Sequence, residues 1–151
     1  MKLHHLMLFI HLAGVILWVG GMAFAHFCLR PAALELPPAE RLGLWSRVLG
    51  RFFRIVWVAI GAIVVSGFAM LLEVGFAQAP RSWHVMAGVG LVMAAVFASI
   101  WFGPWRGLQQ AVAEASWAQG AKAMNGIRQR VMLNLILGTL TVALATLGLA
   151  F

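Results

Sequence analysis

Four long runs of apolar residues, separated by short segments rich in arginine, glycine and proline, dominate this sequence. The runs cover residues 3–29, about 55–72, 83–102 and 131–151. Each is near or above the roughly 18–20 residues that a helix needs to cross a hydrocarbon layer of ~30 Å. Strands crossing a bilayer would instead alternate between apolar and polar positions over about 10 residues. The pattern therefore predicts an all-α membrane protein, a four-transmembrane-helix bundle that forms a single domain over residues 1–151.

With their flanking residues, the helices are predicted at about 3–29, 52–73, 83–103 and 126–151. The pair Pro37-Pro38, followed by Glu40, is typical of a helix start, and Pro104 should end or kink the third helix. The segment 109–130 favours helix and should extend the fourth span beyond the membrane. The seven tryptophans lie mostly near the expected membrane interfaces, as an aromatic belt would.

The composition agrees with a membrane protein. Hydrophobic residues make up 63% of the chain and charged residues only 10%, whereas soluble domains carry roughly 25% charged residues. The net charge of +7 comes from arginines and lysines gathered in two loops rather than from a basic face with exposed aromatic residues. We therefore expect a lipid bilayer, and no nucleic acid, as the partner of this chain.

The loop charges predict an orientation. The first and third loops carry nine of the eleven basic residues, and the opposite side carries only Lys2 and Arg81. By the positive-inside rule, these two loops are cytoplasmic and both termini are periplasmic. The predicted location is the bacterial inner membrane, with several passes. The sequence does not decide between a monomer and a homo-oligomer.

Histidines give the chain its candidate chemistry. His11 lies inside the first apolar run, where an ionisable side chain is costly and is by default a functional hypothesis. In the predicted topology His4, His5 and His84 lie at the same periplasmic level, whereas His26 lies near the cytoplasmic face beside Cys28. We expect His11 to face the interior of the bundle and to find a partner there.

The spacing of these residues indicates a metal site. His4, His11 and Trp18 are spaced by seven residues and share a helix stripe, and Met7 lies next to that stripe. Met86 follows His84 closely on the third helix. Imidazole suits Cu(II), haem iron and zinc, and thioether sulfur selects Cu(I). We therefore predict a copper site near the periplasmic face, with the ligands His11, His84, His4, His5, Met7 and Met86.

Two alternatives remain open at this stage. His11 and His84 could be axial ligands of a haem b, with Arg81 on a propionate, in a protein that exchanges electrons with quinone. Alternatively, His11 is only hydrogen-bonded inside an assembly subunit without a cofactor. Enzymatic activity is the less favoured interpretation, because the sequence offers no nucleophile–base pair and no phosphate-binding glycine motif.

The first span resembles a known family. His11, then Trp18-Val19-Gly20-Gly21, then Arg30-Pro31-Ala32 is similar to the opening helix of copper resistance protein D (CopD) membrane proteins. Arg51-Phe52-Phe53 and Ser66-Gly67 are similar to that family's second helix. The resemblance implies an inner-membrane protein of copper homeostasis that works with a periplasmic copper-binding partner.

The resemblance is not complete. Ala94 and Ala95 stand where a lysine is expected in the third helix. Membrane protoporphyrinogen oxidases, which look similar and use haem, also have a membrane lysine. Its absence here argues against that enzyme activity.

Overall fold

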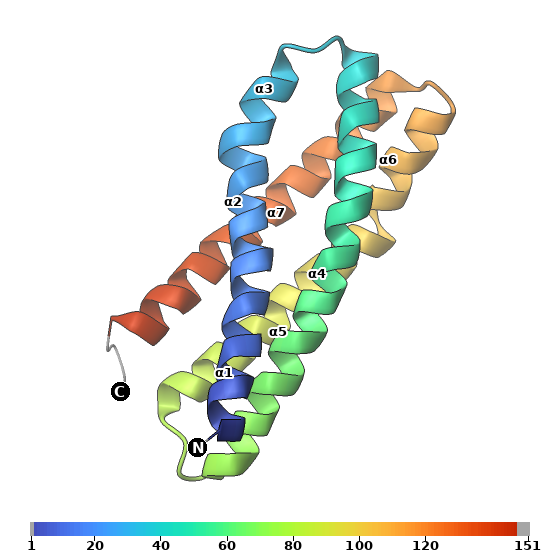
Figure 1. The fold of residues 1–151 in the computed structure, drawn as a ribbon. Helices are drawn as coiled ribbons and strands as arrows, with labels where there is room; N and C mark the ends of the chain where they lie inside the picture. The colour runs from blue at the N-terminus through green and yellow to red at the C-terminus, as the bar shows by residue number, and fades with distance from the viewer. Residues whose placement is uncertain (1, 148–151) are drawn as a thin grey trace.

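The computed structural model describes residues 2–147, and over these residues it is helical apart from short turns (Figure 1). Its four helical rods, Leu3–Leu34, Pro38–Val74, Arg81–Ala113 and Trp117–Thr146, are long and apolar enough to cross a membrane. The predicted all-α, four-span architecture is confirmed. The part of the fourth predicted helix that covers 148–151 lies outside the described residues.

The first rod is one continuous helix with two wider turns. It consists of α1 (Lys2–Val15), the π-helical turn η1 (Ile16–Gly20), α2 (Gly21–Phe24), a second π-helical turn η2 (Ala25–Leu29) and α3 (Arg30–Leu34). Such π turns inside α-helices are rare and frequently accompany functional sites.

The second rod, α4 (Pro38–Val74), has 37 residues and is therefore about 55 Å long. It begins where Pro37-Pro38 predicted a helix start, because Pro37 is extended and Pro38 has the fixed φ of a first helical residue. It ends at Gly75, whose φ of +89° strongly favours glycine. At this length α4 extends well beyond a hydrocarbon layer of ~30 Å.

The third rod breaks where Pro104 predicted. Helix α5 (Arg81–Phe102) ends before Gly103, and α6 (Pro104–Ala113) continues at an angle. The expectation that residues 109–130 extend the fourth helix is wrong in part, because residues up to Ala113 belong to α6. Trp105, Leu108 and Ala111 form a buried stripe on α6, which packs against α7 (Trp117–Thr146).

The helices pair in a fixed way. Helix α1 packs mainly against α4, and α5 and α6 pack mainly against α7. The start of α1 and the turn between α4 and α5 lie together at what we name the loop end (Figure 1). The turns between α3 and α4 and between α6 and α7 lie at the opposite end, which we name the arginine end.

Aromatic rings fill the space between the helices toward the arginine end. Phe53 makes edge contacts with Phe97 and Trp105, at centroid distances of 5.4 Å and 5.3 Å. The expected aromatic belt is wrong for Trp18, Trp45 and Trp105, which are buried in the core. Their large apolar surfaces pack against other helices instead of lying at the lipid interface.

A close approach between the first two rods provides a test of the fold. A Cβ atom added at Gly21 would clash with the Phe52 ring, whereas one at Gly20 would meet nothing within 4 Å. We predict that Gly21→Ala destabilises the protein by about 1–3 kcal/mol through overpacking. Gly20→Ala should be neutral or stabilising, because alanine is the better helix former. Thermal unfolding in detergent, followed by circular dichroism, measures both; equal melting temperatures would contradict the prediction.

Candidate metal site

His11 is held by the backbone and by a side chain of α4. Its Nδ1 lies 3.1 Å from the Ile63 carbonyl oxygen and 3.1 Å from Ser66 Oγ. The Ser66 hydroxyl donates its own proton to the Ala62 carbonyl at 2.6 Å, so it accepts from His11. Because a carbonyl oxygen can only accept, we assign the proton to Nδ1. The Nε2 atom of His11 then keeps its lone pair. The expectation that His11 faces the bundle and finds a partner is confirmed.

His4 and His84 are arranged in a similar way at the loop end. His4 Nδ1 lies 2.9 Å from Glu73 Oε2, at the end of α4, and donates to that carboxylate. His84 Nε2 donates to the Phe76 carbonyl at 3.0 Å. His5 lies beside His4, with ring centroids 6.2 Å apart.

In all three histidines, one ring N–H donates a hydrogen bond to an oxygen acceptor. This is the outer-shell arrangement that metal-binding histidines usually have, because it fixes the tautomer and orients the other nitrogen. His11, His4 and His84 therefore each present one nitrogen that suits a metal ion.

The two contacts of α1 with α4 define an antiparallel register. His4 meets Glu73 and His11 meets Ser66, so the residues of α1 and α4 run past each other in opposite directions. Between these two pairs, the same register places Met7 of α1 at the level of Met70 of α4. Met70 is buried, with 8% of its surface exposed, and Met7 is partly buried.

We name these six residues the His/Met stripe: His4, Met7, His11, Ser66, Met70 and Glu73. Sequence reasoning missed Met70 as a candidate. The spacing of Ser66, Met70 and Glu73 puts the three on one face of α4, but only the pairing of α4 with α1 shows what that face meets.

The predicted residues on α5 lie apart from the stripe. Helix α5 packs mainly against α7, so Arg81, His84 and Met86 are carried by a helix that has little contact with α1. His84 and Arg81 are exposed. No hydrogen bond or ring contact joins His11 to His84 within residues 2–147.

The described part of the chain contains no group of three or more His, Cys, Asp or Glu side chains that could hold a metal ion. The His/Met stripe is of another kind, because it combines imidazole nitrogens with thioether sulfurs. At the other end of the first rod, His26 packs edge-on against Phe27, and Cys28 is exposed. Neither joins the stripe.

A comparison with known families matches residues 46–147 to the family model of copper resistance protein D. The chain belongs to the CopD family. The matched segment covers most of α4 and all of α5, α6 and α7, whereas the resemblance seen in the sequence rested chiefly on the first rod. No curated protein and no solved structure matches the chain.

Substitutions at two serines test the hydrogen bond between His11 and Ser66. Ser66 and Ser99 both donate to a carbonyl of their own helix, but only Ser66 also meets an imidazole from another helix. We predict that Ser66→Ala lowers the free energy of unfolding by about 1 kcal/mol, the usual net value of a hydrogen bond. Ser99→Ala, on an exposed face, should change it by less than about 0.5 kcal/mol. Unfolding in a denaturing detergent measures both, and equal losses would argue against the assigned role of Ser66.

Proposed function

We propose that this CopD-family protein binds copper at the His/Met stripe and serves copper homeostasis in the bacterial inner membrane. The observation that carries the proposal is the register of α1 on α4. In this register Met7 and Met70 lie at one level, between His4 and His11. The Nδ1 atom of each of these histidines donates a hydrogen bond to an oxygen of α4.

The donor set favours the reduced ion. Thioether sulfur selects Cu(I), and imidazole accepts either oxidation state of copper. Met7 and Met70 supply sulfur, His11 supplies nitrogen from the deep side, and His4 with His5 supplies it from the loop end. Glu73 serves by orienting His4.

The stripe supports binding more directly than passage across the membrane. Beyond His11, Gly14 brings α1 onto α4, because a Cβ at this position would lie 2.8 Å from Ile63 Cγ1. The two helices are therefore in close contact inward of His11, and we propose the stripe as the point of capture rather than as a path for copper import.

The charges of the two ends give the proposed orientation. Arg41, Arg47 and Arg51 are among the basic residues toward the arginine end, which the positive-inside rule makes cytoplasmic. The loop end is then periplasmic, and the stripe opens toward the periplasm. A periplasmic copper-binding protein is the proposed source of the ion, and His84 at the same end is a candidate for its first contact.

The haem alternative gains no comparable support. Axial ligation by His11 and His84 requires the two rings to face each other across a haem, whereas α1 and α5 pack mainly on different helices. An optical spectrum of the purified protein tests this alternative, since a bound haem gives a Soret band.

Substitutions in the stripe test copper binding. We predict that His11→Ala and Met70→Leu each weaken the affinity for Cu(I) about tenfold or more, because each removes one ligand, or about 1.4 kcal/mol of binding. Met124→Leu is the matched control, since Met124 is also buried but lies on α7 toward the arginine end. Competition with a chromophoric Cu(I) chelator, in detergent, measures the affinities.

If the wild type binds copper and both stripe variants keep the same affinity for Cu(I), the copper site lies elsewhere in the protein and the proposed site is wrong. No copper bound to the wild type at all would contradict the proposal. Met→Leu keeps the volume of the side chain, so loss of folding is not the expected cause of any effect.

A further inference from the structure

A groove runs along the outer face of α1 and α4, and none of the residues of the His/Met stripe lines it. It has a volume of about 650 Å³ and an almost entirely apolar lining. Small residues, Ala13 and Gly14 of α1 and Ala59 and Ala62 of α4, leave the space open. Larger side chains, which include Phe9, Leu17, Ile55 and Val58, border it.

Arginines border one end of this groove. Arg51 and Arg54 are among its lining residues, and both also line a second groove of about 380 Å³ between α4 and the junction of α5 with α6. Arg47, Gln109 and Trp101 are among the other residues of the second groove. The two grooves therefore meet at a pair of guanidinium groups.

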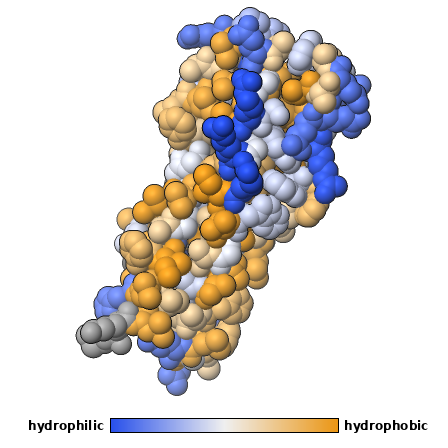
Figure 2. Space-filling view, turned by 45° about the vertical axis from the view of Figure 1, so that its right-hand side comes forward, coloured by the Kyte–Doolittle hydropathy of each residue, from blue (hydrophilic) through white to orange (hydrophobic). Residues whose placement is uncertain are grey.

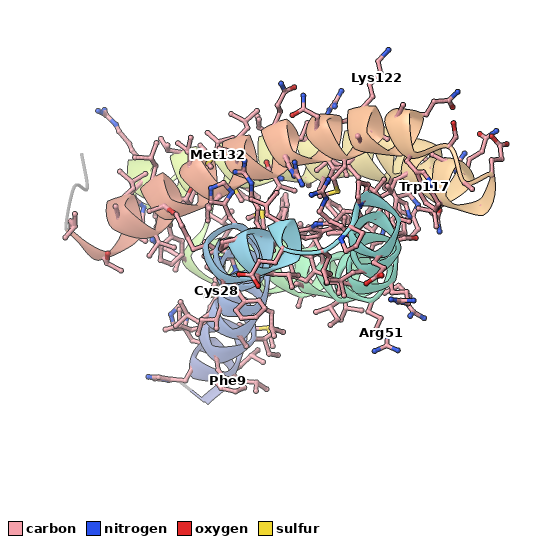
Figure 3. The ribbon with its side chains drawn as sticks, turned by 90° about the horizontal axis from the view of Figure 1, so that it is seen from above. Phe9, Cys28, Arg51, Trp117, Lys122 and Met132 are labelled. Carbon is pink, nitrogen blue, oxygen red and sulfur yellow. The ribbon has the colours of Figure 1, made fainter. Side chains whose placement is uncertain are left out.

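The arginines of this face have no acidic partner. Arg47, Arg51 and Arg54 are spaced by four and three residues, so they share one face of α4, and all three are exposed. Within residues 2–147 none of them forms an ion pair, and Arg54 donates only its Nε hydrogen, to the Gly50 carbonyl at 3.1 Å. Figure 3 shows Arg51 pointing away from the helices. Like charges on neighbouring turns repel, so this face is complementary to an anion.

The position of the groove suits one leaflet of a bilayer. From Arg51 to Ala62, α4 rises about 16 Å, which is roughly half of the ~30 Å hydrocarbon thickness. Figure 2 shows a strongly hydrophilic column that descends from one end of the molecule, with apolar surface around its lower end. An occupant must therefore be anionic at the arginines and apolar over the depth of one leaflet.

We propose that this face is a binding site for an anionic phospholipid. The phosphate lies on Arg51 and Arg54, with the headgroup in the second groove, and one acyl chain lies in the apolar groove between α1 and α4. Arginine suits the phosphate because its planar fork donates two hydrogen bonds at once. This proposal is independent of copper binding, because none of the stripe residues lines either groove.

The test is native mass spectrometry of the purified full-length protein, titrated with phosphatidylglycerol and with phosphatidylcholine of the same acyl chains. We expect phosphatidylglycerol to bind more tightly to the wild type. The double variant Arg51→Gln/Arg54→Gln should lose about tenfold or more of that affinity, since each guanidinium makes a charged hydrogen bond. Arg106→Gln/Lys122→Gln removes the same charge from other exposed positions and should change the affinity less than about twofold.

A third variant tests the apolar part. Ala13→Leu fills the groove without changing charge and should weaken phosphatidylglycerol binding several-fold. Glycerol 3-phosphate, which has the phosphate without acyl chains, should not compete at equal concentration. Equal binding of the two lipids, equal effects of the two double variants, or full competition by glycerol 3-phosphate would overturn the proposal.

Discussion

The cost of an unpartnered polar group in a bilayer governs the arrangement of the first two spans. His11 cannot face lipid cheaply, and Ser66, on the second span, is almost completely buried. Each side chain provides a hydrogen-bond partner for the other. The His11 imidazole donates to the Ile63 carbonyl and to Ser66 Oγ, and the Ser66 hydroxyl donates to the Ala62 carbonyl. Once this contact is made, the level of every other residue of α1 relative to α4 is largely fixed.

Because of this register, the candidate site is a property of two helices rather than of one. His4 and His11 share a stripe of α1, but the side chains that face them come from α4. Glu73 and Met70 contribute to the stripe from α4: Glu73 accepts a hydrogen bond from His4, and Met70 lies at the level of Met7. The other two spans pack mainly on each other. His84 and Met86 are therefore carried by a helix that has little contact with α1.

The sequence was sufficient for the number of spans, the start of α4 and the break at Pro104, because each depends on local properties: length of an apolar run, or the missing donor and fixed φ of proline. The family was also visible in residues such as His11, Trp18 and Gly21, and the match over residues 46–147 confirms it from a different part of the chain. Which helices pair was not visible. All four spans are apolar on most of their surface, so hydropathy alone does not say which face of α4 meets α1. For this reason the sequence did not show that Met70 lies at the level of Met7, and Trp105 was assigned to an interface for a similar one.

The two π turns of the first rod affect the direction in which its side chains point. A π turn takes in more residues than an α turn, so each one rotates the helix before it relative to the helix after it. The turn η1 lies where the first rod changes its neighbours: α1 packs mainly against α4, η1 contacts both α4 and α7, and α2 contacts α7. The wide turn at residues 16–20 thus stands at the point where the first span joins the two pairs of helices into one bundle.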